Sequence, residues 1–345
     1  MANASTDSLA TCAVSVIIPM YNAEEFIAEC FDSLLAQTFK NYEVILVDDA
    51  STDNSCKIVE NYIKKFSGRL NIFHTEKNSG SASVPRNKGL MLSRGEYVLF
   101  VDADDKIAPN ALEEMYNYAK EYNVDIVNCT KMYKMNEDCS GIKIVNLNDS
   151  DELLVETDMA WRVENLLKNK FGWEIWLRLV RRDFLIENEL FFLADVDYGD
   201  DRIWQHGLLF RAKKILHLPR AYYFYRQTKN SIRRKKRNSL QMVNSRLRAV
   251  INGLRWIDDI MEKTPFFKEE PQLRHKVLDY FTRKFYNEIF KYSLKTSQSE
   301  IYESLKQEFG KDFGEHDILI PALCTFVNAN QKKIEKLKEK LEKNK

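Results

Sequence analysis

Residues 95–105 read GEYVLFVDADD, an apolar run that ends in a cluster of acidic residues. Tyr97–Val101 is fully apolar and rich in β-formers, which is typical of a buried strand. Three carboxylates follow within four residues, at Asp102, Asp104 and Asp105. Like charges this close repel one another unless a cation lies between them. Carboxylate and phosphate oxygens are the usual ligands of Mg²⁺ or Mn²⁺, so the stretch predicts a divalent-metal site at a strand end.

Two further apolar runs precede this stretch, and polar residues follow each of them. Val14–Pro19 (VSVIIP) and Tyr42–Val47 (YEVILV) are short and apolar, which predicts two more buried strands. Tyr21 and Asn22 come after the first run, and Asp49 comes after the second. In open α/β sheets, ligands bind beyond the carboxyl ends of the strands, so these side chains are candidates for one site.

Helical spacing alternates with strand signals as far as about residue 226, which implies a doubly wound, mostly parallel α/β sheet. The predicted helices are Ala23–Gln37, Asn54–Phe66, Val84–Arg94, Asn110–Tyr122 and Arg202–Ala212. The remaining predicted strands are Leu70–His74, Val124–Cys129 and Ala221–Arg226. The polar stretch Ser140–Asp151 favours a loop or an edge hairpin.

Strand signals disappear after about residue 240, and the rest of the chain is lysine-rich with helical spacing. We therefore expect a flexible N-terminus over residues 1–11, an α/β domain over residues 12–235 and a helical region over residues 240–345. Residues 331–345 read as a Lys/Glu helix with one apolar face. This helix is either a solvated tail or a coiled-coil element that makes a homo-oligomer.

A basic run, RRKKR at residues 233–237, marks the predicted domain boundary. Arg226 and Ser231 precede it, and the segment has three interpretations. It is a solvated linker, it closes over a diphosphate, or it attracts anionic lipid or a phosphate-bearing acceptor at the membrane surface.

Composition limits the class of protein. The chain has 345 residues, of which 44% are hydrophobic and 30% charged, as in a globular protein. A net charge of +1 gives no general attraction to nucleic acid. The six cysteines show no zinc spacing and the N-terminus no signal peptide, so we expect a cytoplasmic protein. No apolar run approaches the roughly 20 residues that span a bilayer, so a lipid-linked acceptor would be reached from the inner face of the membrane.

Glycine-rich phosphate loops are missing from the sequence, which contains neither GxGxxG nor GxxxxGK[ST]. Their absence disfavours a dinucleotide-dependent dehydrogenase and a P-loop kinase. A diphosphate chelated by a metal ion is the remaining way to hold a nucleotide at this sheet.

Four segments together resemble the family-two glycosyltransferases of GT-A fold. They are Val14–Asn22 (VSVIIPMYN), Asp48–Ser55 (DDASTDNS), Arg86–Gly89 (RNKG) and Gly95–Asp105 (GEYVLFVDADD). A weaker resemblance continues at Trp176–Phe184, Gly199–Asp201 and Tyr223–Ile232. The resemblance implies an inverting, metal-assisted transferase that moves a sugar from a nucleotide-sugar, most often a UDP-sugar, to a glycan or lipid-linked glycan acceptor.

The resemblance also implies which residues hold the nucleoside. Pro19 and Tyr21 would line the base pocket, with Tyr21 packing against uracil. Asn22 would belong to the same nucleotide-sugar site. Asp49 would bind the edge of the base.

A second group of implied residues serves the diphosphate and the metal ion. Arg86 would approach the diphosphate or the donor sugar, and Ala103 would line the same site. Asp104 would be the principal ligand of Mn²⁺ or Mg²⁺, and Asp105 would lie close by. Asp102 would contact the ribose or the metal shell.

The catalytic base is implied by a third motif. Family members carry Gly-Glu-Asp where this chain reads Gly199-Asp200-Asp201, and the aspartate that ends the motif acts as the base. The base is therefore mapped to Asp201, with Asp200 as the open alternative. Inversion needs one group that deprotonates the acceptor hydroxyl, and the start of a helix favours the ionised carboxylate that this requires.

Two other classes of protein share part of this pattern. A pyrophosphorylase-like nucleotidyltransferase is also α/β and metal-dependent, but it needs a glycine-rich loop where Pro19–Asn22 has none. A non-catalytic nucleotide-sugar-binding module is disfavoured because candidates for the metal site and the base are both present.

Overall fold

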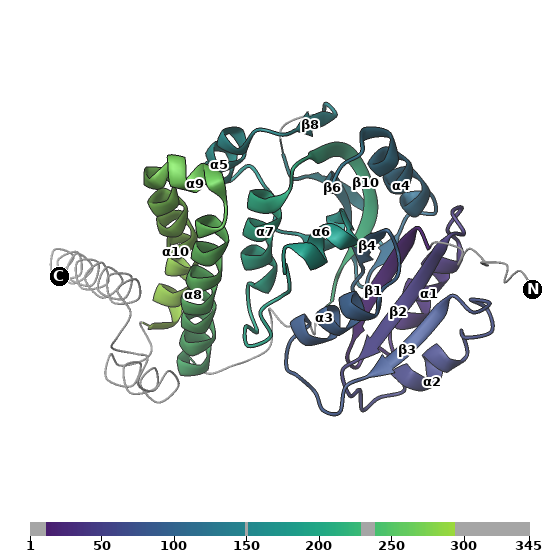
Figure 1. Ribbon diagram of the computed structural model, residues 1–345. Coiled ribbons are helices and arrows are strands. Elements are labelled where there is room, and N and C mark those ends of the chain that lie inside the picture. The colour runs from purple at the N-terminus through teal and green to yellow at the C-terminus, as the bar shows by residue number, and fades with distance from the viewer. Residues whose placement is uncertain (1–11, 149–150, 229–238, 294–345) are drawn as a thin grey trace, which may run out of the picture. The chain divides into compact units, whose positions relative to one another are not determined.

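The computed structural model describes residues 12–148, 151–228 and 239–293 (Figure 1). The chain divides into two compact units, residues 1–235 and 236–345. Three of the segments singled out from the sequence lie outside the described residues: the N-terminus, the basic run with Ser231, and the tail helix at residues 331–345.

The first unit is built on one mixed sheet. Its strands are β1 (Val14–Met20), β2 (Tyr42–Asp48), β3 (Leu70–His74), β4 (Tyr97–Phe100), β5 (Lys106–Ile107), β6 (Ile126–Asn136), β7 (Lys143–Asn146), β8 (Leu154–Glu156), β9 (Arg178–Arg181) and β10 (Ile215–Gln227). The strand order is β3-β2-β1-β4-β9-β6-β10-β5, with β7 paired to β6 and β8 to β10. Most of the pairing is parallel, and the predicted α/β fold is confirmed.

The helices of the first unit alternate with these strands. They are α1 (Ile27–Leu35), α2 (Ser55–Glu60), α3 (Ser83–Leu92), α4 (Ala111–Tyr122), α5 (Met159–Leu167), the 3₁₀ turn η1 (Ile175–Leu177), α6 (Arg182–Glu187) and α7 (Asp200–Arg211). The helix predicted to end at Phe66 is shorter, because α2 ends at Glu60 and turns follow. The predicted edge hairpin is confirmed, since β7 pairs antiparallel with β6.

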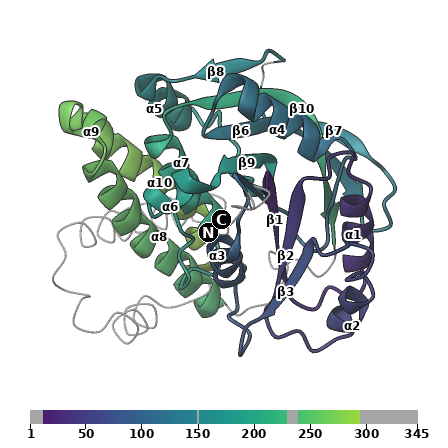
Figure 2. The ribbon, with the colours of Figure 1, turned by 45° about the vertical axis from the view of Figure 1, so that its right-hand side comes forward.

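Helices cover both faces of the first strands. Figure 2 shows α1 and α2 on one side of β1–β3 and α3 on the other. Val16 and Ile18 of β1 belong to the apolar core that includes Phe31 of α1. Ile17 points the other way, toward α3, where a Cβ added to Gly89 would lie 2.4 Å from its Cγ2 atom. Residues on both faces of β1 are therefore buried, as expected for a central parallel strand.

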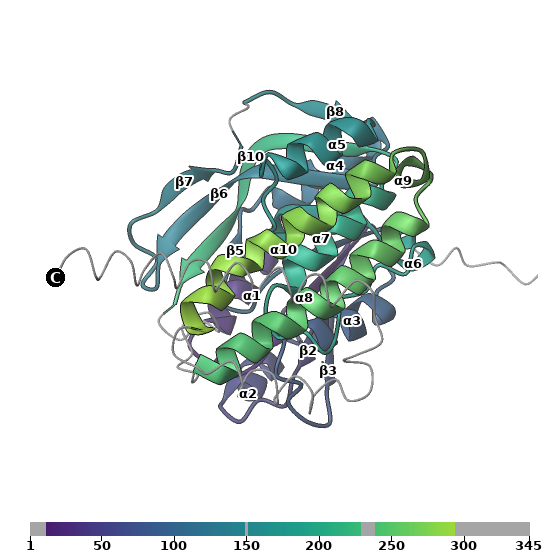
Figure 3. The same cartoon turned by 90° about the vertical axis from the view of Figure 1, so that its left-hand side faces the viewer.

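The second unit is helical over the residues that the structure describes in it. Its helices are α8 (Ser239–Glu262), α9 (Pro265–Glu269) and α10 (Pro271–Ser293). α8 and α10 lie side by side (Figure 3) and bury apolar side chains such as Ile251, Leu254, Phe281 and Phe285. In neither unit is any described helix long and apolar enough to cross a membrane.

Candidate active site

Three neighbouring strands end at the same edge of the sheet. β1 lies between β2 and β4 and pairs parallel with both, so the residues after the three strands converge. We call this edge the strand-end site and define it by Tyr21, Asn22, Asp49, Asp102 and Asp104. Pro19 lies in β1 and is half-buried, and Ala103 is buried.

The loops after β1 and β2 are hydrogen-bonded to each other. The backbone N–H of Asn22 donates to Ser51 Oγ at 2.9 Å, and the N–H of Thr52 donates to Asn22 Oδ1 at 2.7 Å. Asn22 has a φ of 47°, in the left-handed region that asparagine tolerates. These hydrogen bonds fix the loop and leave the neighbouring Tyr21 at the surface, with 44% of the residue exposed. Its ring can therefore stack on a planar ligand.

Asp49, which the sequence analysis placed at the edge of the base, is buried. It is only 3% exposed. Its Oδ1 accepts from Thr75 Oγ1 at 2.9 Å, and its Oδ2 accepts from the N–H and Oγ of Ser79 at 2.9 and 2.8 Å. Asp49 therefore fixes the loop between β3 and α3. Its contact with a base edge stays a prediction.

Arg86 joins two acidic motifs that are far apart in the sequence. Its guanidinium donates to Asp102 Oδ1 at 2.9 Å and to Asp200 Oδ2 at 3.1 Å. Burial would lower the pKa of Arg86, but the charges of Asp102 and Asp200 outweigh it and the pKa is raised. The end of β4 and the start of α7 are thus held together by one buried cation.

Asp105 differs from its neighbours because it faces the interior. It is 1% exposed, and its oxygens accept from Tyr223 Oη and from the N–H of Arg226, both at 2.7 Å. The Tyr223 oxygen in turn accepts from the N–H of Asp102 at 3.0 Å. Asp105 therefore holds the acidic loop in shape, and we remove it from the set of candidate metal ligands.

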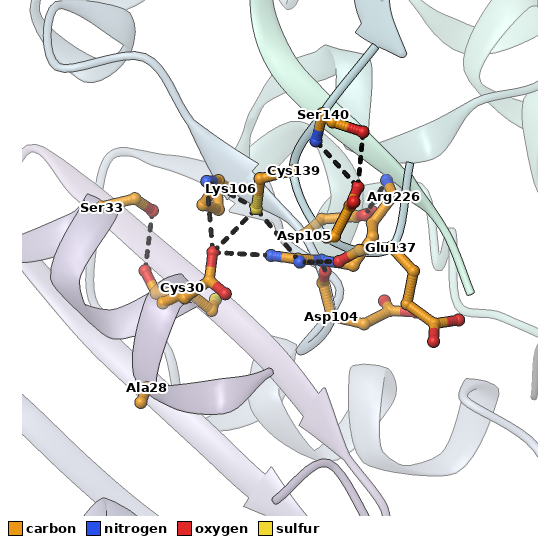
Figure 4. A network of polar contacts seen from close by, with 12 residues as sticks. Ala28, Cys30, Ser33, Asp104, Asp105, Lys106, Glu137, Cys139, Ser140 and Arg226 are labelled. Atoms are coloured by element: carbon orange, nitrogen blue, oxygen red, sulfur yellow. Dashed lines mark hydrogen bonds and ion pairs between the residues drawn. The ribbon is translucent and has the colours of Figure 1, made fainter. Parts of the chain in front are cut away.

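Arg226 clamps the acidic loop from the other side (Figure 4). Its Nε donates to the main-chain oxygen of Asp104 at 2.8 Å, and its Nη2 donates to Glu29 Oε2 at 2.9 Å. Cys139 lies beside this pair, with its thiol 3.0 Å from the same Glu29 oxygen. Burial would raise the pKa of Glu29, but hydrogen bonds from Cys139 and Arg226 outweigh it and lower the pKa to about 2. Arg226 is only 2% exposed, so its role is to support the site.

The remaining carboxylates, Asp102 and Asp104, are suited to a divalent cation. Both are partly exposed at the strand-end site. Burial and the charge of Asp102 raise the pKa of Asp104 to about 6, so the positive charge of Arg226 offsets them only in part and the ionised Asp104 would gain from further positive charge nearby. An oxygen-ligated Mg²⁺ or Mn²⁺ would supply that charge, and the donor set fits either ion.

The predicted base motif begins α7. Gly199 has a φ of 78°, a conformation that favours glycine, and it turns the chain so that Asp200 and Asp201 occupy the first turn of the helix. Asp200 accepts from Ser83 Oγ at 3.0 Å as well as from Arg86, which fixes its carboxylate. Asp201 is half-buried, and its Oδ1 accepts from the N–H of Arg202 at 2.9 Å. The motif thus contains one carboxylate bound to Arg86 and a neighbour bound to its own helix.

Sequence reasoning did not identify Ser83 or Tyr223 as site residues. Tyr223 lies in the weakly matching segment Tyr223–Ile232, and that position was the only signal available. Ser83 gives no signal, because a serine that begins a helix is common and its contact with Asp200 spans the fold.

Comparisons with known proteins agree with this geometry. The family model described as glycosyl transferase family 2 matches residues 15–142. The glycosyltransferase GlyG of Streptococcus pneumoniae is 30% identical over 224 residues, which cover 64% of this chain and 73% of GlyG. The poly(ribitol-phosphate) β-N-acetylglucosaminyltransferase TarP of Staphylococcus aureus is 47% identical over 116 residues, which cover 33% of this chain and 35% of TarP.

A solved structure extends the likeness to most of the chain. The crystal structure of S. aureus TarS 1–349 in complex with UDP aligns with a TM-score of 0.65 and 25% identity, and the alignment covers 85% of this chain and 78% of that one. The chain spans less than two thirds of the length of several other curated relatives that it matches. The predicted GT-A fold is confirmed, and the chain belongs to glycosyltransferase family 2.

Proposed function

We propose that this chain is an inverting glycosyltransferase that moves a sugar from a UDP-sugar to a carbohydrate or lipid-linked carbohydrate acceptor. The observation that carries the proposal is the Arg86 bridge, which unites the acidic strand end at Asp102 with the base motif at Asp200. The UDP bound in the similar TarS structure supports the choice of nucleotide. The name of TarP, which acts on poly(ribitol-phosphate), supports a sugar-alcohol polymer as an acceptor to be tested.

The exposure and contacts of each residue at the strand-end site indicate its role in donor binding. The surface ring of Tyr21 stacks on the uracil, while Asn22 keeps the loop that carries it in place. Asp102 and Asp104 would hold a Mn²⁺ or Mg²⁺ ion, which supplies positive charge that stabilises the leaving diphosphate. Arg86 adds a fixed positive charge on the same side of the sheet.

Asp201 is the proposed base. Its carboxylate takes the proton of the acceptor hydroxyl while the hydroxyl oxygen forms a bond to the anomeric carbon. The bond from that carbon to the diphosphate oxygen breaks, and UDP leaves with its electron pair. The N-terminus of α7 stabilises the ionised carboxylate before the reaction. The described cysteines carry free thiols, which supports the cytoplasmic location that we propose for the enzyme.

Turnover of a panel of UDP-sugars, with and without EDTA, tests the proposal. A transferase releases UDP, and the release rises with acceptor and falls with EDTA. A nucleotidyltransferase would instead exchange pyrophosphate into the nucleotide-sugar, and a binding module would show a UDP-induced rise in melting temperature without turnover. An α-linked product from an α-linked donor would rule out a single inversion.

A further inference from the structure

The first unit contains a cavity of about 280 Å³ that none of the strand-end residues line. It lies between the sheet and α5, under the loop at residues 170–174. Its walls include Trp161, Phe171, Glu174, Arg178 and His217. The volume is near the lower end of the range for ligand pockets, roughly 300–1,000 Å³, so it suits one small unit rather than a chain.

Four polar side-chain atoms around this cavity have no hydrogen-bond partner among the residues that the structure describes. They are Glu174 Oε2, Arg178 Nη1, His217 Nε2 and Asn148 Oδ1. Arg178 and His217 are each only 5% exposed. Buried polar atoms without partners are costly and uncommon, so this concentration points to a ligand or to ordered water in the cavity.

The hydrogen-bond network determines which of these atoms donate. Arg178 Nε donates to Asn128 Oδ1 at 3.0 Å, which turns the Asn128 amide nitrogen toward His217 Nδ1 at 3.3 Å. Nδ1 therefore accepts, and the proton of the neutral ring is on Nε2. Burial, with a smaller effect of Arg178, lowers the pKa of His217 to about 4, so the ring is neutral near pH 7. The cavity offers two donors, from Arg178 and His217, and two acceptors, from Glu174 and Asn148.

The charges of the cavity walls also balance. Arg178 faces the opposite charge of Glu174, so the pair does not select an anion. Phe171 adds an apolar wall, with its ring stacked on His217 at a centroid distance of 5.6 Å and Trp161 across its edge at 5.8 Å. Hydroxyl groups both donate and accept, and the C–H faces of sugars suit aromatic walls. The combination therefore matches an uncharged, polyhydroxylated ligand.

We propose that this cavity binds one sugar or sugar-alcohol unit of the acceptor. The claim that this unit belongs to the acceptor rests on the proposed function. The claim that the ligand is an uncharged, polyhydroxylated molecule rests on the cavity walls alone. The carbonyl of Gly172, over the cavity, accepts from Gln205 of α7 at 2.8 Å. The first turn of α7 also carries Asp201, so one helix connects the cavity to the proposed base.

Saturation-transfer NMR on the full chain tests the proposal, with ribitol, N-acetylglucosamine and inorganic phosphate as probes. We expect saturable binding of ribitol or N-acetylglucosamine that phosphate does not displace. Glu174→Gln keeps the size of the side chain and removes its charge, and it should weaken this binding about tenfold or more. Asn148→Ala removes a second acceptor and should weaken it independently. Glu164→Gln is the matched control, because its side chain is 61% exposed on α5, and it should bind as the unsubstituted chain does.

A UDP-induced shift in melting temperature, measured on the same samples, separates the two proposals. UDP binding without saturable polyol binding would mean that the cavity holds water only, and would overturn this inference. Displacement by phosphate, or unchanged binding by both Glu174→Gln and Asn148→Ala, would also overturn it. Polyol binding without any UDP shift would contradict the proposed function and leave the assignment of the cavity standing.

Discussion

Arg86 and Arg178 are both buried arginines of the first unit, but their surroundings differ. At the strand-end site, Arg86 is paired with Asp102 and Asp200, and its pKa is raised. At the cavity, burial lowers the pKa of Arg178 to about 10, because the charges of Glu174 and Asp201 oppose it only in part. The first region is organised in advance by its own charges. The second has buried polar atoms that no described residue of the chain satisfies, which leaves them open to a bound molecule or water.

The largest expected effect concerns the strand-end site. Asp104→Ala removes a proposed metal ligand and should reduce UDP-sugar turnover to background, because the leaving diphosphate loses its counter-charge. The fold should persist, since it is the main-chain oxygen of Asp104 that binds Arg226. Asp105→Ala is the contrast. It leaves buried donors without a partner and should cost about 1–3 kcal/mol of stability, measured by urea unfolding. Full turnover by Asp104→Ala in metal-depleted buffer would contradict the assignment.

A second test separates the two carboxylates that begin α7. Asp201→Asn keeps the size of the side chain and removes the proton acceptor, so the turnover number should fall about 10²–10⁴-fold while UDP-sugar affinity stays nearly constant. Asp200→Asn should reduce turnover less, because Asp200 is engaged by Arg86 and Ser83. The reverse result would assign the base to Asp200. Activity in both variants would direct the search to Asp195 or Asp197.

A third test addresses the support of the cavity. Arg162 of α5 is 1% exposed and pairs with Glu156, which is 4% exposed. Arg162→Met leaves that carboxylate buried without its partner and should lower the free energy of unfolding by about 3–5 kcal/mol. Lys168→Met on the same helix breaks an exposed pair with Glu164 and should cost less than about 1 kcal/mol. Equal urea midpoints for the two variants would show that the burial of an ion pair does not decide how much stability its loss costs.

The smallest expected effect is a dependence of stability on pH. The pKa of His217 is lowered from 6.5 to about 4 in the folded chain, so between these values the unfolded chain binds more protons. The stabilisation is complete above pH 6.5 and is lost as the pH falls through this window, with roughly 2 kcal/mol lost at pH 5. His217→Gln removes this titration and should make the curve of unfolding free energy less steep between pH 7 and pH 5. The buried His206, whose pKa is also lowered to about 4, keeps part of the slope. If the unfolding free energies of the unsubstituted chain and His217→Gln fall by the same amount between pH 7 and pH 5, His217 does not cause the pH dependence.

The sequence predicted the regular half of the fold better than the irregular half. β1, β2 and β3 begin where their apolar runs begin, because β1 and β2 are buried along almost their whole length and the edge strand β3 starts at the buried Leu70. β9 was missed because it is four residues long and has an arginine at each end. Its place between β4 and β6, antiparallel to both, depends on contacts distant in sequence.

The candidate site shows the same division. A motif can indicate that Asp102, Asp104 and Asp105 act together, but it cannot tell which carboxylate points inward. That choice depends on Tyr223, more than 100 residues away, whose hydroxyl binds Asp105. The cavity had no sequence signal at all. Arg178 and His217 come from separate strands, β9 and β10, and His217 belongs to no motif that the sequence analysis identified.

The position of Arg86 has a thermodynamic consequence. Its guanidinium is shared between Asp102, on the donor side, and Asp200, beside the proposed base. A metal–diphosphate bound at Asp102, as we propose, would compete with Arg86 for that carboxylate and so change the ion pair between Arg86 and Asp200. Such coupling is reciprocal. If donor binding changes the affinity for the acceptor by some factor, acceptor binding changes the affinity for the donor by the same factor. In the proposed enzyme, the donor and acceptor sites would therefore be coupled through the side chain of Arg86.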